Sequence, residues 1–415
     1  MIGELHTDQN MVDMPIGRLR SIKGDEAVFS RIYEKKLLID RSMLWHKIGQ
    51  RMNFLADYNG IYCGRTMSKG QKPDNMNRNR NTDLLPYDSS LVKLSPTAGN
   101  RGGYINASLL DFDKRAGRKY ILTTAPPASQ NECYWQMIWE QRIPSVVVLT
   151  EVYELGFKAW EKHYPEDLGE IVQYGIYRIE CKRFDNFENK YQYREMLLIK
   201  EGKQEVRELV HYKMIGWGEE SVPSIEQFFE FYDVVRAAQA LRPGKHNTFV
   251  PVLPKWLGGA DRTPTSYAPI IQCATGNGRS GTLAIIDVFL TMIEKGRRDL
   301  YVIEKWILRA RARRRQAVKT QQQHAFIYEV VLHELLKRHK ELEHLQKYLD
   351  EHAGTVRRIN CSSSFEVERY IKPKHWIIDE KQRDRYIGKK QWVRRVMFEG
   401  KKCELSTKYD DYVIE

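Results

Sequence analysis

The sequence predicts an α/β or α+β fold with a single core. Short strand patterns accumulate in the middle of the 415-residue chain, and helical patterns follow them. Between the two regions, residues 269–289 (PIIQCATGNGRSGTLAIIDVF) have the pattern of an apolar strand, a glycine-rich loop and an apolar helix. Because 42% of the residues are hydrophobic, the chain has ample material for such a core.

The individual elements follow from hydrophobic periodicity and from turn residues. Strands are predicted at 102–110, 118–125, 144–152, 174–186, 191–202 and 207–215. Helices are predicted at 29–58, 224–241, 280–295, 300–317 and 321–348. The Asn- and Arg-rich segment 68–83 is predicted to be a loop, and the tail from about 351 is expected to be a helical and irregular appendage.

The charge of the chain indicates an anionic partner, because the net charge is +13 and the pI is about 9.2. Nucleic acid is not expected, since basic and acidic residues are interspersed and no zinc-finger, RNA-recognition or basic-zipper pattern occurs. The one dense basic run, KWILRARARRRQAVK at 305–319, contains no acid. This run indicates either a solvated helix face or a binding site for an anionic ligand near the glycine-rich loop.

The sequence also bears on the cellular compartment. No apolar run approaches the roughly 18 residues that a transmembrane helix needs, and the first residues lack the apolar stretch of a signal peptide. The six cysteines are scattered without the paired spacing of a zinc site, so we expect free thiols, no metal and no cofactor. A cytoplasmic location is expected, with peripheral attachment at a membrane or cortex left open.

The glycine-rich loop carries the strongest chemical signal, because Cys273 and Arg279 stand at its two ends. The residues between them are Ala274, Thr275, Gly276, Asn277 and Gly278. Glycines permit the positive φ angles with which successive N–H groups can point inward, and the following helix adds its positive N-terminal end. An anion there would meet N–H donors and a bidentate guanidinium, in a field that also stabilises a nucleophilic thiolate. The spacing Cys-x5-Arg, followed by Ser-Gly-Thr, disfavours the plainer interpretation of a core thiol beside a turn.

The motif QCATGNGRSGT resembles the signature of the phosphotyrosine-specific protein tyrosine phosphatases, His-Cys-x5-Arg-Ser/Thr-Gly-Thr. Further fragments resemble that family in its order: NRNTDLLPYDSSLVKL, YINASLL, RKYILTTAPP, YWQMIWEQRIPSVVVLTEVYELG, VRELVHYKMIGWGEESVPS and KTQQQHAFIYEV. The resemblance covers residues 25–348 and implies one phosphatase-type domain with a twisted mixed central sheet flanked by helices. An N-terminal segment, 1–24, would precede it, and a basic, mixed extension, 349–415, would follow it.

The resemblance also implies roles for single residues. In the family, a thiolate attacks phosphotyrosine, an acid on a mobile loop protonates the leaving phenol, and a glutamine positions the water that hydrolyses the phosphocysteine. Cys273 would be the nucleophile, Arg279 would bind the phosphoryl oxygens, and the hydroxyl of Ser280 would assist departure of the thiolate. Gln323 matches the second glutamine of its loop, and Glu154 matches an acid that buttresses the signature arginine.

Residues at the mouth of the pocket are implied in the same way. Arg80 and Arg314 match basic residues that border the pocket, and Asp83 matches the acid that holds the peptide backbone. Asn81 replaces the aromatic residue that stacks on the substrate ring and sets the pocket depth. Ala159 and the segment TTAP also depart from the pattern.

The other departures concern the chemical steps. Gln272 replaces the histidine before the cysteine and cannot carry charge. Gly218 and Glu219 replace Pro-Asp on the mobile loop, so that the carboxylate is one methylene longer and sits on a freer backbone. Lys319 replaces the glutamine that orients the hydrolytic water.

These changes affect turnover more than binding. They favour a phosphotyrosine-protein-binding regulator with impaired or absent phosphatase activity, a pseudophosphatase, whose partner is a tyrosine-phosphorylated protein, with a kinase among the candidates. The alternative is an active but slow phosphatase that uses Cys273 as nucleophile and Glu219 as general acid. A second alternative is a non-catalytic interaction module that acts through its basic surface. The sequence gives no indication of the oligomeric state.

Overall fold

The computed structural model describes residues 64–338 except 113–115, 152, 155–156, 159–160, 189, 241–267 and 296–302, together with 49, 52–53, 56, 395–398 and 401–404. The N-terminal segment 1–24, most of the helix predicted at 29–58 and most of the extension 349–415 lie outside the described residues. Within that extension, β12 (Arg395–Phe398) pairs with β13 (Lys401–Glu404) as an antiparallel hairpin.

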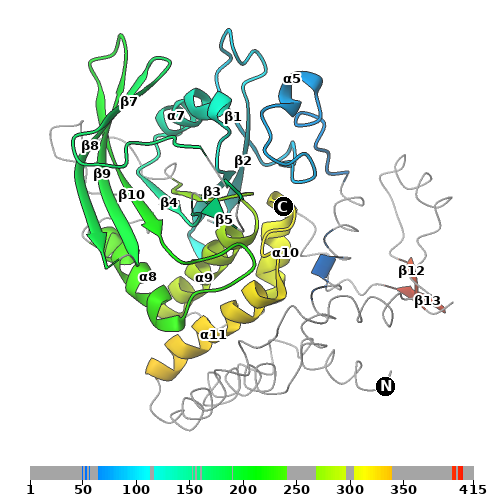
Figure 1. Ribbon diagram of the computed structural model, residues 1–415. Helices are drawn as coiled ribbons and strands as arrows, with labels where there is room; N and C mark the ends of the chain where they lie inside the picture. The colour runs from blue at the N-terminus through cyan, green and yellow to red at the C-terminus, as the bar shows by residue number, and fades with distance from the viewer. Residues whose placement is uncertain are drawn as a thin grey trace.

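A nine-stranded mixed sheet forms the centre of the described part (Figure 1). Its strand order is β1-β2-β3-β11-β4-β10-β9-β8-β7. The strands are β1 (Leu91–Lys93), β2 (Tyr104–Asp111), β3 (Lys119–Thr124), β4 (Ser145–Val148), β7 (Ile171–Tyr174), β8 (Tyr177–Phe187), β9 (Tyr191–Lys200), β10 (Val206–Met214) and β11 (Ile270–Cys273). The four central strands β3, β11, β4 and β10 are parallel, and the outer strands pair antiparallel, which confirms the mixed sheet. A separate hairpin joins β5 (Tyr153–Glu154) and β6 (Phe157–Lys158).

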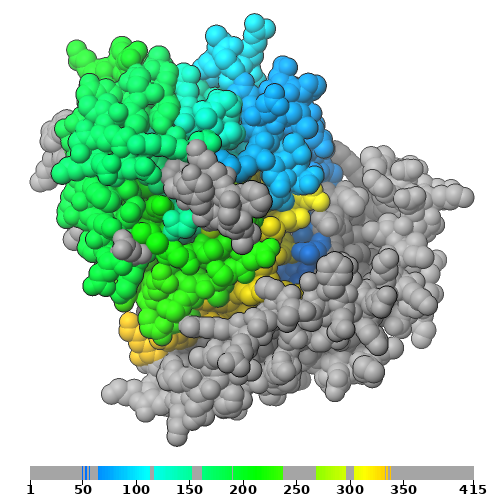
Figure 2. All heavy atoms as spheres, in the orientation of Figure 1, coloured from blue at the N-terminus to red at the C-terminus, as the bar shows by residue number. Residues whose placement is uncertain are grey.

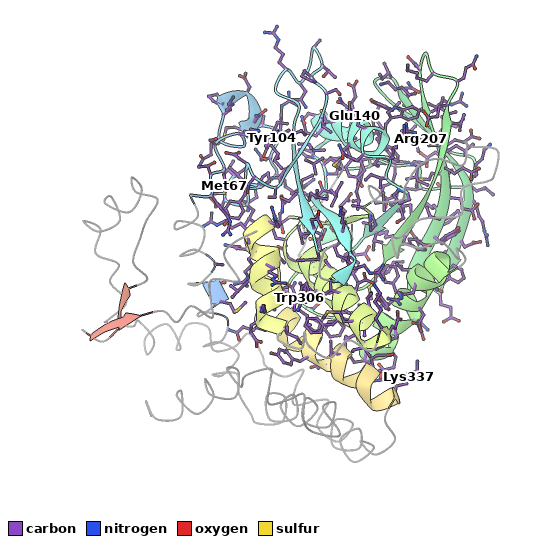
Figure 3. The ribbon with its side chains drawn as sticks, turned by 180° about the vertical axis from the view of Figure 1, so that it is seen from behind. Met67, Tyr104, Glu140, Arg207, Trp306 and Lys337 are labelled. Atoms are coloured by element: carbon purple, nitrogen blue, oxygen red, sulfur yellow. The ribbon has the colours of Figure 1, made fainter. Side chains whose placement is uncertain are left out.

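Helices cover both faces of this sheet (Figure 1). One face packs against α7 (Asn131–Glu140), and the other packs against the four helices α8 (Ile225–Ala240), α9 (Gly278–Glu294), α10 (Ile303–Arg313) and α11 (Gln321–Arg338). Two short elements, α5 (Pro73–Met76) and the 3-10 helix η1 (Ala128–Gln130), lie in connecting segments. In the view from behind, Figure 3 labels Trp306 of α10 and Tyr104 of β2, and both side chains are fully buried.

Successive side chains of strand β11 point to opposite faces of the sheet, so each lies in one of the two cores. Ile271 and Cys273 belong to the core under α8–α11, whereas Ile270 belongs to the core under α7. Because side chains alternate along a strand, Gln272 shares the α7 side with Ile270. The cysteine and the glutamine before it therefore lie on opposite faces of the sheet.

A buried polar cluster fixes the helices to the sheet away from the loop. Asp287 of α9 is fully buried and accepts hydrogen bonds from the hydroxyls of Tyr120 on β3 and Tyr232 on α8. Arg118 Nε lies 3.1 Å from Asp287 Oδ2 and 2.9 Å from Thr291 Oγ1. Burial raises the pKa of both tyrosines well above their ordinary value, so that each stays a hydroxyl donor.

Candidate functional site

The glycine-rich loop lies between β11 and α9, as predicted. Strand β11 ends at Cys273 and helix α9 begins at Gly278, with both Cys273 and Arg279 buried. Gly276 has a φ of +69°, and a Cβ at this position would lie 2.4 Å from the carbonyl carbon of Thr123 on β3. The loop thus turns back tightly over the end of the neighbouring strand, and only glycine fits at its centre.

Arg314 braces this loop from beneath. Its Nε donates to the carbonyl oxygen of Gly276 at 3.1 Å, and its Nη2 donates to that of Thr275 at 2.9 Å. Because the N–H and C=O of a peptide unit point in opposite directions, carbonyls turned toward Arg314 leave the following N–H groups facing the other side. Burial lowers the pKa of Arg314 to about 10, which leaves the guanidinium charged at neutral pH. Arg314 was predicted to border the pocket, and its side chain is fully buried against the loop.

Arg279 connects the loop to the segment that carries Glu219. Its Nη1 donates to the backbone oxygen of Trp217 at 2.6 Å. Trp217 is itself buried, with its ring centroid 5.9 Å from that of Phe326 and 6.3 Å from that of Phe228. The residues after β10 are therefore packed down against the signature arginine.

Glu219 and Lys319, two of the departures from the family pattern, contact each other. The distance from Lys319 Nζ to Glu219 Oε1 is 3.2 Å. Gln323 joins the same group, because its Nε2 donates to the backbone oxygen of Glu219 at 3.1 Å. Its Oε1 accepts from the backbone N–H groups of Lys319 at 3.0 Å and Thr320 at 3.3 Å. Both ends of the Gln323 amide are thus bonded to backbone groups.

These contacts lie directly beside the glycine-rich loop. A Cβ on Gly278 would lie 2.9 Å from Gln323 Oε1 and 3.3 Å from Lys319 Cβ. The next residue but one, Ser280, is fully buried, and among the described residues its hydroxyl has no hydrogen-bond partner. The structure therefore brings the predicted loop, acid and glutamine residues to one place.

Gln272 contacts a histidine that sequence reasoning did not single out. His163 Nε2 lies 3.2 Å from Gln272 Oε1, and His163 Nδ1 lies 2.9 Å from the carbonyl oxygen of Glu161. Burial lowers the pKa of His163 to about 4, so the ring is neutral and has one N–H to donate. The Gln272 Nε2 atom is buried and lacks an acceptor within the described part of the chain.

The two ends of a glutamine amide are distinguished by their hydrogen-bond partners. With the proton of His163 on Nδ1, facing the carbonyl oxygen of Glu161, a flipped Gln272 amide would place its N–H against Nε2. The flipped amide would remove the clash between two acceptors and give the buried amide nitrogen a partner. No sequence motif indicates the contact of His163 with Gln272, because the two residues lie 109 positions apart in the chain.

The residues predicted at the mouth of the pocket lie in the segment that precedes β1. Arg80 is partly buried, and its Nε donates to the carbonyl oxygen of Ala125 at 3.1 Å. Asn81 and Asp83 are exposed, and Asn81 Oδ1 accepts from the backbone N–H of Asp83 at 2.7 Å. Asn81 thus caps its own turn. Figure 2 shows the segment that precedes β1 in blue and the β7–β10 region in green on one face of the molecule.

A tyrosine holds the mouth segment against the sheet. Tyr104 (Figure 3), from β2, donates its hydroxyl to Asn79 Oδ1 at 2.7 Å. On the other side, Arg315 Nη1 donates to the backbone oxygen of Asp83 at 3.3 Å. Glu154 lies on β5, but its side chain and all of Ala159 are outside the described residues.

Two further findings concern only the described ranges. They contain no group of three or more His, Cys, Asp or Glu residues that could hold a metal ion. They also contain no helix with the length and hydropathy needed to cross a membrane.

A buried thiol and a buried guanidinium lie at the two ends of a tight loop, at the start of a helix, and such an arrangement can hold an anion beside a nucleophile. This arrangement is typical of a cysteine-dependent phosphatase. The protein-tyrosine phosphatase family model matches residues 75–333. The chain belongs to this family.

Curated relatives support this membership. The chain is 39% identical over 383 residues to the Caenorhabditis elegans "Tyrosine-protein phosphatase non-receptor type eak-6", an alignment that covers 92% of each chain. It is 31% identical over 315 residues to "Protein sdf-9" of the same organism, covering 75% of this chain and 89% of the relative. It is 26% identical over 271 residues to the rat "Tyrosine-protein phosphatase non-receptor type 9", covering 64% of this chain and 43% of the relative.

Proposed function

We propose that the protein binds tyrosine-phosphorylated proteins in the cup formed by residues 273–279 and that it hydrolyses them poorly or not at all. The carrying observation is the ion pair between Glu219 and Lys319, with 3.2 Å between Lys319 Nζ and Glu219 Oε1. It joins the residue that replaces the catalytic acid to the residue that replaces the water-orienting glutamine. A cytoplasmic location belongs to the same proposal.

The ion pair supports weak acid catalysis. A general acid has to lie within hydrogen-bond reach of the leaving oxygen. In this chain the Oε1 atom of Glu219 is directed to the Lys319 ammonium. Misplacement of a catalytic group by about 1 Å costs on the order of a hundredfold in rate.

The hydrolytic step lacks its positioning group. A lysine ammonium has three donors and no acceptor, so Lys319 cannot accept a hydrogen bond from an attacking water. Gln323 retains the amide, but its carbonyl end accepts from two backbone N–H groups and its amino end donates to the Glu219 backbone. Neither side chain offers an acceptor to a water above Cys273.

The binding parts are independent of these changes. The phosphoryl oxygens would meet the N–H groups of the loop that Arg314 braces and the guanidinium of Arg279. The start of α9 would add its positive potential at the same point. Phosphate binding therefore does not require the side chains at positions 219, 272 or 319.

The slow-phosphatase alternative rests on one specific observation. The segment carrying Glu219 is packed against the cup through Arg279 and Gln323, so a carboxylate is present at its rim. If a bound phosphotyrosine drew Lys319 away, Glu219 would be free to protonate the leaving phenol. Cys273 and Glu219 would then support turnover.

The test measures binding and phosphate release on the same full-length protein. Calorimetry with a phosphotyrosine peptide and with its unphosphorylated form gives the binding, and phosphate release with the same phosphopeptide gives the turnover. Phosphate-dependent binding without release supports the proposal. Steady turnover at about 10 per second, a typical enzymatic rate, would establish the slow-phosphatase alternative or better. Binding that does not depend on the phosphate would favour the interaction module.

A further inference from the structure

The segment 215–222, here called the acid loop, follows β10 and carries Glu219. At its start, Gly216 N–H donates to Glu151 Oε1 at 3.1 Å, and Gln227 Nε2 donates to the Ile215 oxygen at 2.8 Å. The indole N–H of Trp217 donates to the Ser221 oxygen at 3.0 Å, which folds the loop onto itself. These contacts shape the loop but do not touch the cup.

Within the described part of the chain, three other contacts tie the acid loop to residues at the cup. Two of them reach its backbone, from Arg279 to the Trp217 oxygen and from Gln323 to the Glu219 oxygen. The third is the ion pair between the side chains of Glu219 and Lys319. The backbone contacts form with any residue at position 219, whereas the third needs opposite charges at two positions 100 residues apart.

The cup lies beside this closure, since the acid loop contacts Arg279 at one end of it. Cys273, at the other end, is only 2% exposed, so a reagent needs a local opening to reach its thiol. The side chains of Glu219 and Lys319 are 27% and 35% exposed, so their pair is accessible to salt and to competing anions. A phosphoryl dianion that approaches the cup would attract Lys319 and repel Glu219.

We propose that the Glu219–Lys319 ion pair is a latch that keeps the acid loop closed over Cys273 in the free protein, and that an anionic ligand enters by breaking it. Only the identity of the ligand rests on the proposed function, since the latch is a property of the free chain. Ligand entry and release are then limited by separation of the two charges. The latch would thus regulate the rates at which the ligand binds and dissociates.

The experiment measures alkylation of Cys273 by iodoacetamide in the free full-length protein, by peptide-resolved mass spectrometry and at several pH values. Variants are E219Q, K319M and the charge exchange E219K/K319E. The matched control is E220Q, because Glu220 is the next residue, is exposed, and has no ion pair among the described residues. Thermal unfolding of each variant confirms that it is folded.

Both single variants should raise the alkylation rate about two- to fivefold, the change that corresponds to an exposed ion pair of up to about 1 kcal/mol. The charge exchange should bring the rate back toward that of the parent, and E220Q should leave it unchanged. Raising NaCl should speed alkylation of the parent more than that of K319M.

A purely electrostatic effect on the thiolate predicts a different pattern. Removing the negative Glu219 would speed alkylation, but removing the positive Lys319 would slow it. Opposite signs in E219Q and K319M, or a charge exchange as fast as the single variants, would overturn the latch. Hydrogen exchange of the acid loop gives the second measurement, and unchanged protection in both single variants would likewise overturn it. Phosphopeptide affinity and phosphate release, measured separately, would leave the proposed function standing in that case.

Discussion

At the scale of single residues, the guanidinium of Arg279 has two tasks. Its Nη1 holds the backbone oxygen of Trp217 at 2.6 Å, and the rest of its planar donor array is placed at the end of the loop that begins with Cys273. A lysine has no rigid fork and cannot do both. Under the proposed function, the residue would couple ligand binding to the position of the acid loop.

We expect Arg279→Lys to weaken binding of a phosphotyrosine peptide at least tenfold, or about 1.4 kcal/mol. Calorimetry measures the change. Arg178→Lys is the matched control, because Arg178 lies on the exposed side of β8. Unchanged affinity in Arg279→Lys would show that the peptide binds elsewhere.

Turnover should respond to the two residues of the ion pair changed together. Glu219→Asp with Lys319→Gln removes the ammonium and provides an amide that can orient water, so phosphate release from an aryl phosphate should rise at least tenfold, about 1.36 kcal/mol of barrier. Adding Cys273→Ser to this variant should abolish the gain. A double variant no faster than the parent would show that the defect lies elsewhere in the cup.

Much of the site follows from the sequence because its spacing is local. Cys273 and Arg279 are six positions apart, and a strand, a glycine-rich turn and a helix leave them few arrangements. The contact of Glu219 with Lys319 and the contact of His163 with Gln272 are set by tertiary packing. Each depends on where distant strands and helices meet, which no local pattern encodes.

At the scale of elements, the turn from β11 into α9 depends on Gly276. Its φ of +69° is open to glycine, and its would-be Cβ meets backbone atoms of β3 at 2.4 Å. Backbone atoms in a central strand cannot move aside as a flexible side chain can. Both conformation and space therefore require a glycine here.

Gly276→Ala should destabilise the fold and abolish phosphopeptide binding. Gly202→Ala is the matched control, because Gly202 has a φ of +72° but nothing within 4 Å of its would-be Cβ. The control should lose only the stability that a positive φ costs an alanine, about 1 kcal/mol, and should still bind the phosphopeptide. Thermal unfolding and calorimetry measure the two effects. Equal losses in both variants would contradict the close-packing argument.

Helix and strand predictions succeeded where the pattern was long and one-sided. Helices α8, α9 and α10 and strands β2, β3, β8, β9 and β10 lie within the predicted segments or deviate from them by one or two residues. Helix α7 was missed because eight of its residues, from Asn131 to Trp139, are buried, so no polar face marks it. Strand β1 has three residues, too few to show a period, and only the family resemblance of segment 79–94 indicated it.

At the scale of the whole molecule, the sheet separates two cores, and the buried histidines His163 and His211 lie on the α7 side. His163 is fully buried beside Tyr134 and Tyr164, and His211 of β10 lies with its ring centroid 4.1 Å from that of Tyr164. Burial lowers the pKa of His163 to about 4 and that of His211 well below its ordinary value. Positive Arg80 acts in the same direction on His163, and Arg194 and Lys213 do so on His211.

This burial predicts acid sensitivity. The folded pKa of His163 is below the unfolded value of 6.5, so the unfolded chain takes up a proton first as the pH falls. The stability that is present above pH 6.5 should therefore be lost progressively toward pH 4, by about 3 kcal/mol for this group. Urea unfolding from pH 7 to pH 4 measures it, with His163→Gln as comparison. A slope that is equal in the two proteins would contradict the assignment.

The brace under the loop has a consequence for the order of folding. Arg314 bonds Gly276 across 38 positions and Arg279 bonds Trp217 across 62, so the cup closes only after distant parts of the chain have met. Contacts of long sequence separation form late, because their loop-closure entropy precedes any gain. We therefore expect a chain still on the ribosome to have no affinity for phosphotyrosine until Arg314, which directly follows α10, has emerged. Incomplete chains would then not compete with the finished protein for its ligand.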